Sequence, residues 1–244
     1  MRGKISWREV VELERCLLSV DWDYFIDTDK ENWGSYLESG RSLLDLWYKR
    51  YLEAQAAGRD LTESFRLSPG WNVFWRKIRR QFSFARGVRA YVTDSHALSY
   101  DIARKHRWGV VCLFDAHADL GYGPGALDFE VNCSNWLGRL LKDGLIQRAH
   151  IFYSPYTREK PEHFRSVTGR YNVRFEDFSS QSRTFTVAAV HICRSGAWTP
   201  PWLDEKFFRF VRALGIPCAV TDCPERKWDP AHMTLSDQIR YLLA

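Results

Sequence analysis

The 244-residue sequence contains no run of about 20 uncharged apolar residues, the length that a helix needs to cross a bilayer, which excludes a membrane-spanning helix. Residues 1–16 carry a charge every two or three positions and lack the apolar centre of a secretory signal, so we expect a cytoplasmic protein. Internal repeats, low-complexity tracts and linkers rich in Pro, Gly or Ser are also lacking. With 45% hydrophobic residues, the chain can bury a sizeable core, and we expect a single domain over residues 1–244.

The six cysteines occur singly, without any CxxC pair. Cys16, Cys112 and Cys193 lie inside apolar runs and are expected to be small buried side chains. A disulfide framework is not expected, because such frameworks belong mainly to short secreted chains.

The charge of the chain does not identify a partner. The formal net charge is only +5, and the basic excess is concentrated in "WRKIRRQFSFARGVR" at residues 75–89. This segment can be the solvated face of an amphipathic helix, or a surface that attracts an acidic peptide or, less readily, nucleic acid.

Apolar runs and helical periodicities alternate along most of the chain, which predicts an α/β fold with a mainly parallel sheet and helices on both faces, a three-layer α/β/α arrangement. A largely helical insert is expected at about residues 30–85. The expected strands cover residues 16–20, 89–93, 109–114, 149–154 and 184–193, and the expected helices cover 36–57, 71–82, 96–106, 135–144 and 203–215.

Acidic and imidazole side chains follow three of the expected strands. In open parallel sheets, ligands bind at the carboxyl ends of the strands, and alternate residues of an extended segment point to the same side. "DWD" follows the first strand, a histidine follows the strand at 89–93, and "DAHAD" follows the buried run "GVVCLF". The candidate metal ligands are Asp21, Asp23, His96, Asp115, His117 and Asp119.

Such a set of side chains favours a site for cations. Crowded buried carboxylates repel one another, and a divalent cation supplies the missing positive charge. Four carboxylates and two imidazoles exceed the needs of one tetrahedral zinc and suit two metals that share bridging carboxylates. Ligation without thiolates favours two Mn²⁺ ions, with Zn, Fe and Co as alternatives. Taken alone, "DWD" is equally typical of an acidic loop or helix cap, and a histidine at a helix start is typical of a cap.

The motif "DAHADL" resembles the signature of the arginase (ureohydrolase) superfamily, to which histone deacetylases are more distantly related. "SVDWDYF" resembles the DxD motif of that superfamily, and "VTDSHAL" resembles the segment that provides its first histidine ligand. In ordinary arginases the DxD motif follows DAHxD, whereas here it precedes it. With "NCSNWL" and "ICRSGAWTPPWLD", this order resembles a divergent branch that includes peptide arginases, which mature ribosomally made peptides. The resemblance covers five short stretches between residues 19 and 204.

The resemblance implies a manganese-dependent peptide arginase that converts arginine side chains of a precursor peptide to ornithine and releases urea. A hydroxide bridging the two ions would attack the guanidinium carbon. Asp119 and His117 are the expected catalytic residues, and Asp119 would pass a proton to the departing amine. Ordinary arginases carry a proton-shuttling histidine where this chain has "FEVNCSNW", so His191 or water takes its place as the candidate. In the implied arrangement Asp115 and Asp21 bridge the ions, His96 and Asp119 complete one site, and His117 and Asp23 complete the other.

Several residues are candidates for binding the substrate. The segment "GAWTPPWLD" is either a rigid connection from strand to helix or one wall of the pocket, and "DCPERKWDP" provides Asp222 and Glu225 either as guanidinium anchors or as surface charges. The helical insert either packs against the domain or forms a groove for an acidic leader peptide. The expected substrate-binding residues are Asn132, Asn135, Ser195, Trp198 and Glu225.

Two other functional classes stay open. One is a ureohydrolase or deacetylase that acts on a small guanidino compound or an acetylated amine. A single-metal deacetylase would have no use for Asp23 and His96, so guanidine hydrolysis is favoured. The other is a non-catalytic peptide-binding domain with a structural metal site. We expect no membrane partner and no nucleic acid, and the sequence contains no pattern that predicts an oligomeric state.

Overall fold

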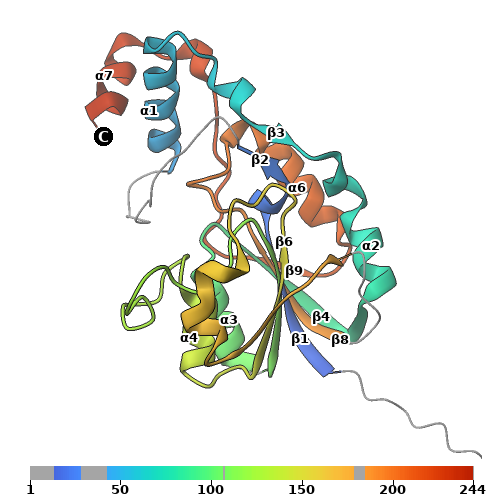
Figure 1. Cartoon of the computed structure of the whole chain (residues 1–244). Helices are drawn as coiled ribbons and strands as arrows, with labels where there is room; N and C mark the ends of the chain where they lie inside the picture. The colour runs from blue at the N-terminus through green and yellow to red at the C-terminus, as the bar shows by residue number, and fades with distance from the viewer. Residues whose placement is uncertain (1–13, 29–42, 107, 179–184, 244) are drawn as a thin grey trace, which may run out of the picture.

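The computed structural model describes residues 14–28, 43–106, 108–178 and 185–243. Seven strands form one sheet in the order β7-β6-β5-β1-β8-β4-β9, and all the pairings between them are parallel (Figure 1). A separate antiparallel pair joins β2 (Ile26–Asp27) to β3 (Arg66–Leu67). The strands of the large sheet are β1 (Glu14–Asp21), β4 (Ser83–Thr93), β5 (Val110–Asp115), β6 (Arg148–Tyr153), β7 (Asn172–Phe175), β8 (Phe185–Cys193) and β9 (Cys218–Val220).

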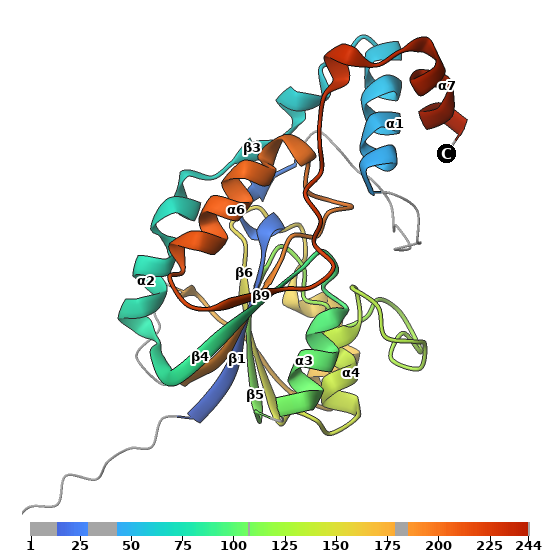
Figure 2. The same cartoon turned by 180° about the vertical axis from the view of Figure 1, so that it is seen from behind.

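Helices cover both faces of this sheet. Helices α3 and α4 lie on one face, α2 and α6 lie on the other, and α1 packs against α7 beyond the carboxyl ends of the strands (Figures 1 and 2). The expected three-layer α/β/α fold is therefore confirmed. The α-helices are α1 (Leu43–Ala56), α2 (Phe74–Gln81), α3 (Leu98–His106), α4 (Trp136–Lys142), α5 (Arg165–Thr168), α6 (Asp204–Ala213) and α7 (Leu235–Leu243).

The interior strand β5 shows how the two faces are filled. All six of its residues are buried. Val110, Cys112 and Phe114 belong to the hydrophobic cluster that contains the aromatic side chains of α2 and α6. Val111 and Leu113 belong to the cluster formed with α4. Alternate residues of a strand face opposite sides, so a continuous apolar run is what a strand covered on both faces requires.

The expected elements are present with shifted boundaries. β4 begins at Ser83 instead of residue 89, with an irregular register between Phe84 and Arg89. A 3-10 turn at Pro69–Val73 precedes α2, so that this helix begins at Phe74. Residues 36–42 of the expected helix at 36–57 lie outside the described residues, and α1 begins at Leu43. Within its described part, the expected insert at 30–85 contains α1, α2 and short 3-10 turns.

Several elements were not predicted from the sequence, among them β7, β9 and α7. β7 and β9 are the edge strands and have only four and three residues, and all three residues of β9 are exposed. Helix α7 buries only Tyr241 among its residues. The two strands are too short for an apolar alternation to be recognised. Helix α7 does have apolar residues at helical spacing, Leu235, Ile239 and Leu242, and was missed.

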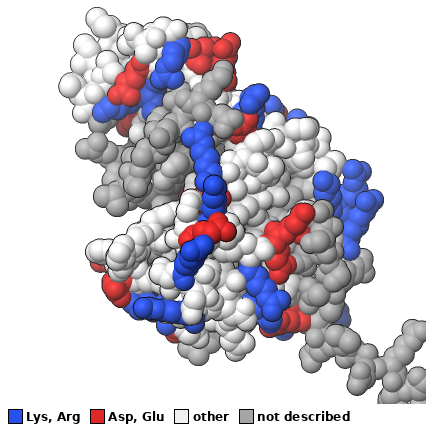
Figure 3. Space-filling model, viewed as in Figure 1, with Lys and Arg blue, Asp and Glu red and all other residues white. Residues whose placement is uncertain are grey.

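The basic segment at 75–89 includes most of α2. Phe74, Trp75 and Ile78 of this helix are buried, while its lysine and arginine side chains are exposed. Basic side chains accordingly gather on that side of the molecule in Figure 3. This arrangement supports the interpretation as the solvated face of an amphipathic helix. Among the described helices, none combines the length and the apolar character needed to cross a membrane.

Candidate metal centre

The candidate ligands meet at the carboxyl edge of the sheet, where four neighbouring strands end. Asp21 is the last residue of β1 and Asp115 the last residue of β5, and these two strands are paired directly. On the other side of β1, Cys193 ends β8 in register with Asp21, and Thr93 ends β4 in register with Cys193. Since neighbouring strands lie about 4.8 Å apart, side chains at these ends are within reach of one another.

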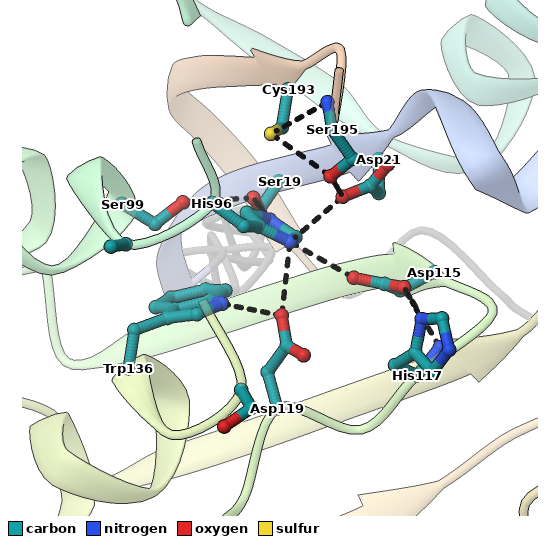
Figure 4. Close-up of polar contacts among 12 residues, drawn as sticks. Ser19, Asp21, His96, Ser99, Asp115, His117, Asp119, Trp136, Cys193 and Ser195 are labelled. Atoms are coloured by element: carbon teal, nitrogen blue, oxygen red, sulfur yellow. Dashed lines mark hydrogen bonds and ion pairs between the residues drawn. The ribbon is translucent and has the colours of Figure 1, made fainter. Parts of the chain in front are cut away.

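His96, which precedes α3, is at the centre of the cluster. Its Nδ1 atom lies 3.1 Å from Asp21 Oδ2, 3.0 Å from Asp115 Oδ2 and 2.9 Å from Asp119 Oδ2 (Figure 4). The side chains of all four residues are at most 7% exposed. One ring nitrogen carries at most one proton, so it cannot donate to three carboxylates at once. The pocket therefore contains more negative charge than its own residues can neutralise.

A second group of ligands lies beside the first and shares Asp115 with it. His117 Nδ1 is 3.0 Å from Asp23 Oδ2 and 3.5 Å from Asp115 Oδ1. Asp115 thus directs one carboxylate oxygen toward each imidazole. The His117 side chain is 45% exposed, so this second group faces the open side of the site.

The side chains converge by turns and not by the extended alternation that the sequence analysis assumed. β1 ends at Asp21, and Asp23 belongs to a 3-10 turn whose first N–H groups need an acceptor. Asp21 Oδ1 accepts from the Asp23 N–H at 3.0 Å, and Asp115 Oδ1 accepts from the His117 N–H at 2.8 Å. Asp119 has a φ of 51°, in the left-handed region. Its carbonyl accepts from the N–H groups of Leu137 and Gly138 at the start of α4, which holds this conformation.

Burial and like charges dominate the electrostatics. Burial raises the pKa of Asp115 well above its ordinary value, and the charges of Asp23, Asp119 and Asp21 add to the effect. Burial and the charge of Asp23 likewise raise the pKa of Asp21. Burial alone would lower the pKa of His96, but its contacts with the three carboxylates raise it well above its ordinary value. All of these shifts have the direction expected of a pocket that favours positive charge.

The residues fit divalent cations. The buried Oδ2 of Asp115 receives no hydrogen bond from any described residue, although it lies near His96. His96, Asp115 and Asp119 form one group of ligand atoms that could hold an ion, with all atoms within 4.8 Å of one another, and Asp23, Asp115 and His117 form another. Oxygen and imidazole donors suit Mn²⁺ and its neighbours in the first transition row. The expectation of two Mn²⁺ ions stays a prediction.

Cys193 was not expected near the ligands. It is fully buried, as predicted for a cysteine in an apolar run, but its Sγ also falls in a third group with Asp21 and His96. The Ser195 N–H donates to this sulfur at 3.3 Å. Its position follows from the register between β8 and β1, which the sequence does not reveal.

Two further side chains orient the carboxylates. The indole N–H of Trp136 donates to Asp119 Oδ2 at 2.6 Å, and the Ser195 hydroxyl donates to Asp21 Oδ2. Donors of this kind fix the carboxylates that would bind a metal. Ser195 has a φ of 51°, a strained conformation for a residue other than glycine.

A buried chain of charges holds the loop that contains Ser195. Arg194 donates from Nε and Nη2 to the two carboxylate oxygens of Asp94 at 2.8 and 2.6 Å, and from Nη1 to Asp204 at 2.8 Å. Arg226 also pairs with Asp204 and donates to the carbonyl of Gly196 at 2.7 Å. A Cβ atom at Gly196 would lie only 2.4 Å from Asp94 Oδ1, so this position requires glycine.

Of the expected substrate-binding residues, Ser195 and Trp198 lie at the site. Trp198 lines a cavity of about 170 Å³ together with His117 and Asp23. Asn135 and Asn132 instead hold the preceding loop. Asn135 donates to the carbonyls of residues 126 and 130 and accepts from the Asn132 N–H, and Asn132 accepts from residue 134.

The remaining candidates do not meet at the cavity. Glu225 and Asp222 are exposed, and among the described contacts none joins Glu225 to the carboxylates. His191 lies in the interior of β8, fully buried beneath His96. Burial, aided by the charge of His96, holds the pKa of His191 well below its ordinary value. A buried neutral imidazole without contact to the cavity is a poor proton donor to a leaving group.

Glu159 is a candidate that the sequence analysis missed. It lines the same cavity as His117, and its Oε2 accepts from the Ala118 N–H at 2.8 Å and from the Tyr153 hydroxyl at 3.2 Å. Its Oε1 accepts from the Tyr122 hydroxyl. Burial raises its pKa, which the nearby His117 counteracts. One feature of the sequence could have indicated Glu159: it lies in the loop that follows β6, and the end of β6 is level with Asp115.

Comparison with protein-family models, with curated proteins and with solved structures finds no match to this chain. The case for its function therefore depends on the site itself.

Proposed function

We propose that this chain is a metal-dependent hydrolase that converts arginine side chains of a ribosomally made peptide to ornithine and releases urea. The observation that carries the proposal is the pair of ligand groups that share Asp115, one of which borders a small cavity through Asp23 and His117. In this proposal Asp115 and Asp21 would serve both cations, His96 and Asp119 would complete one site, and His117 and Asp23 would complete the other. A bound pair of divalent cations makes a water molecule acidic enough to act as a nucleophile near neutral pH.

The cavity supports an arginine side chain as the substrate group. Its volume of about 170 Å³ is below the range of about 300–1,000 Å³ that is common for small-molecule pockets, so it suits one side chain better than a whole ligand. Glu159 provides a carboxylate whose position is fixed by its hydrogen bonds to Ala118 and Tyr153. In this proposal Glu159 binds the guanidinium group of the substrate, because a guanidinium pairs well with a carboxylate of fixed geometry. Trp198 would pack against the aliphatic part of the side chain.

Proton transfer is assigned to Asp119. Its Oδ2 atom is engaged by the indole N–H of Trp136, which fixes the orientation of the carboxylate. Oδ1 would accept the proton released by the attacking water and return it to the departing amine. His191 has no part in this step because it is buried on the far side of His96.

The test is mass spectrometry of arginine-containing peptides after incubation with the Mn²⁺-loaded chain, together with a urea assay. We expect the mass change from arginine to ornithine and an equal amount of urea, and neither with Asp115→Asn. Urea released only from free arginine or another small guanidino compound would change the substrate class. A chain that binds two cations and hydrolyses no guanidine would overturn the proposal.

A further inference from the structure

A buried row of hydrogen bonds runs from His96 away from the carboxylates and into the sheet. The Nε2 atom of His96 lies 2.9 Å from Ser19 Oγ (Figure 4), and Ser19 Oγ lies 3.2 Å from Nδ1 of His191. Nε2 of His191 lies 2.8 Å from Thr93 Oγ1. All four side chains belong to residues that are at most 2% exposed, so water does not compete for these contacts. Of these four residues, only His96 is a candidate metal ligand.

The direction of the hydrogen bonds follows from the far end of the row. The Thr93 hydroxyl donates its single proton to the carbonyl of Ser95 at 2.8 Å, so it faces His191 with a lone pair. His191 must therefore carry its proton on Nε2 and accept on Nδ1. Two hydroxyls face that Nδ1 atom, those of Ser19 and Ser99.

Ser19 transfers this direction to His96. We assign its one proton to His191 Nδ1 or to the Ser99 oxygen, which is 3.3 Å away, and not to His96 Nε2. In either case the lone pairs of Ser19 Oγ are left to accept a hydrogen bond from the Nε2–H of His96. The opposite ring nitrogen, Nδ1, faces the three carboxylates, and once it gives up its proton to them or to solvent its lone pair is free for a cation bound there.

We propose that Ser19 and His191 are positioning residues that fix His96 in its Nε2–H tautomer, so that Nδ1 is preset as a metal ligand. The inference depends on the metal centre of the proposed function, but it concerns binding of the cation and not the chemistry of the substrate. Metal-ligating histidines generally donate their second ring N–H to an outer partner, and loss of that partner typically weakens metal binding about 10- to 100-fold.

The two serines provide a matched pair of variants. Both are fully buried and both side chains are in contact with His191, but only the Ser19 side chain is in contact with the His96 ring, whereas Ser99 contacts His96 through the backbone. Titration of the metal-free proteins with Mn²⁺ in a calorimeter should show that Ser19→Ala binds about 10- to 100-fold more weakly than wild type. Ser99→Ala should bind nearly as well as wild type. Equal affinities of the two variants, or a wild-type protein that binds no divalent cation, would overturn the inference.

Replacing the buried histidine tests the direction of the row. His191→Asn retains a hydrogen-bonding group near the position of Nδ1, whereas His191→Phe removes both ring nitrogens. We expect the Asn variant to recover most of the metal affinity that the Phe variant loses, although both alter the core packing. Equal losses in the two variants would indicate a packing role and overturn the inference.

Nitrogen-15 NMR of the Zn²⁺-loaded protein is a readout that packing alone would not change. The wild type should show His96 with a protonated Nε2 protected from exchange and a metal-bound Nδ1. Ser19→Ala should lose the protection of that proton, and a protonated Nδ1 in the wild type would refute the proposed direction. A failure of the proposed function looks different, because the metal and tautomer results would hold while no urea is released.

Discussion

The substitution Asp115→Asn should have opposite effects on the stability of the metal-free and metal-loaded chain. Asp115 is 1% exposed, and its Oδ2 atom receives no hydrogen bond from a described residue. The charges of Asp23, Asp119 and Asp21 surround it. In the metal-free chain, Asn replaces this oxygen with an amide that can donate to a neighbouring carboxylate. The substitution therefore removes a repulsive charge and satisfies a buried polar position, whereas in the loaded chain it removes the carboxylate shared by both ligand groups.

The magnitudes follow from these two effects. Satisfying one buried polar group is worth about 1–3 kcal/mol, so the metal-free variant should be more stable than wild type by that amount. In a chain of this size, 1 kcal/mol corresponds to roughly 2–4 °C, which gives a rise in Tm of roughly 2–12 °C. At a metal concentration of about 100 times Kd, wild type should gain about 2.7 kcal/mol per site. The variant should gain little, because each of the two ligand groups has lost a member.

Thermal and urea unfolding with chelator and with excess Mn²⁺ measures both effects. Asp101→Asn is the matched control, because its side chain is 61% exposed and should shift stability by less than about 0.5 kcal/mol in either condition. Our interpretation of the cluster as a cation site would be refuted if Asp115→Asn destabilised the metal-free chain, or if it gained as much stability from Mn²⁺ as wild type does.

Three more substitutions separate the parts of the site. Trp136→Phe keeps an aromatic ring but removes the N–H donor to Asp119. Mn²⁺ affinity measured by calorimetry should therefore fall about 10- to 100-fold. An unchanged affinity would exclude an orienting role for Trp136. Glu159→Gln should leave Mn²⁺ affinity nearly unchanged and raise KM for an arginine peptide by about 10-fold or more. Such a rise corresponds to the loss of a charged hydrogen bond worth about 1.5–3 kcal/mol. A loss of metal binding would instead show that Glu159 belongs to the metal centre. Arg194→Met breaks the buried ion pairs with Asp94 and Asp204 and should lower the free energy of unfolding in urea by about 3–5 kcal/mol. A loss below about 1 kcal/mol would show that the loop containing Ser195 does not depend on these ion pairs.

The fold and the ligands could be predicted because their signals are local. The continuous apolar run of β5 needs cover on both faces, and its two-sided burial follows directly from that pattern. The acidic and imidazole groups stand immediately after strands, so the parallel sheet brings them to one edge. Gly144, expected to end a helix, has a φ of 66° two residues after α4 ends at Lys142.

The parts that could not be predicted depend on spatial order. Glu159 is one of several charged residues in an exposed loop, and only the pairing of β6 with β5 brings it to His117. Cys193 enters the site through the register of β8 with β1. The local backbone of the two acidic motifs was not predictable either. DWD enters a 3-10 turn and DAHAD ends in the left-handed residue Asp119, because side-chain hydrogen bonds to the backbone compete with continued extension of the strands.

The strand order also explains why the order of the motifs along the chain does not prevent a common site. β1, which carries Asp21, lies between β5, which carries Asp115, and β8. All three strands are parallel and end at the same level. Each motif therefore reaches the same edge of the sheet, whichever motif comes first along the chain. A site of this type requires only that the strands be neighbours with matched register. The position of the DxD motif ahead of DAHAD is therefore compatible with the paired ligand groups seen here, and what matters for them is that Asp115 faces both His96 and His117.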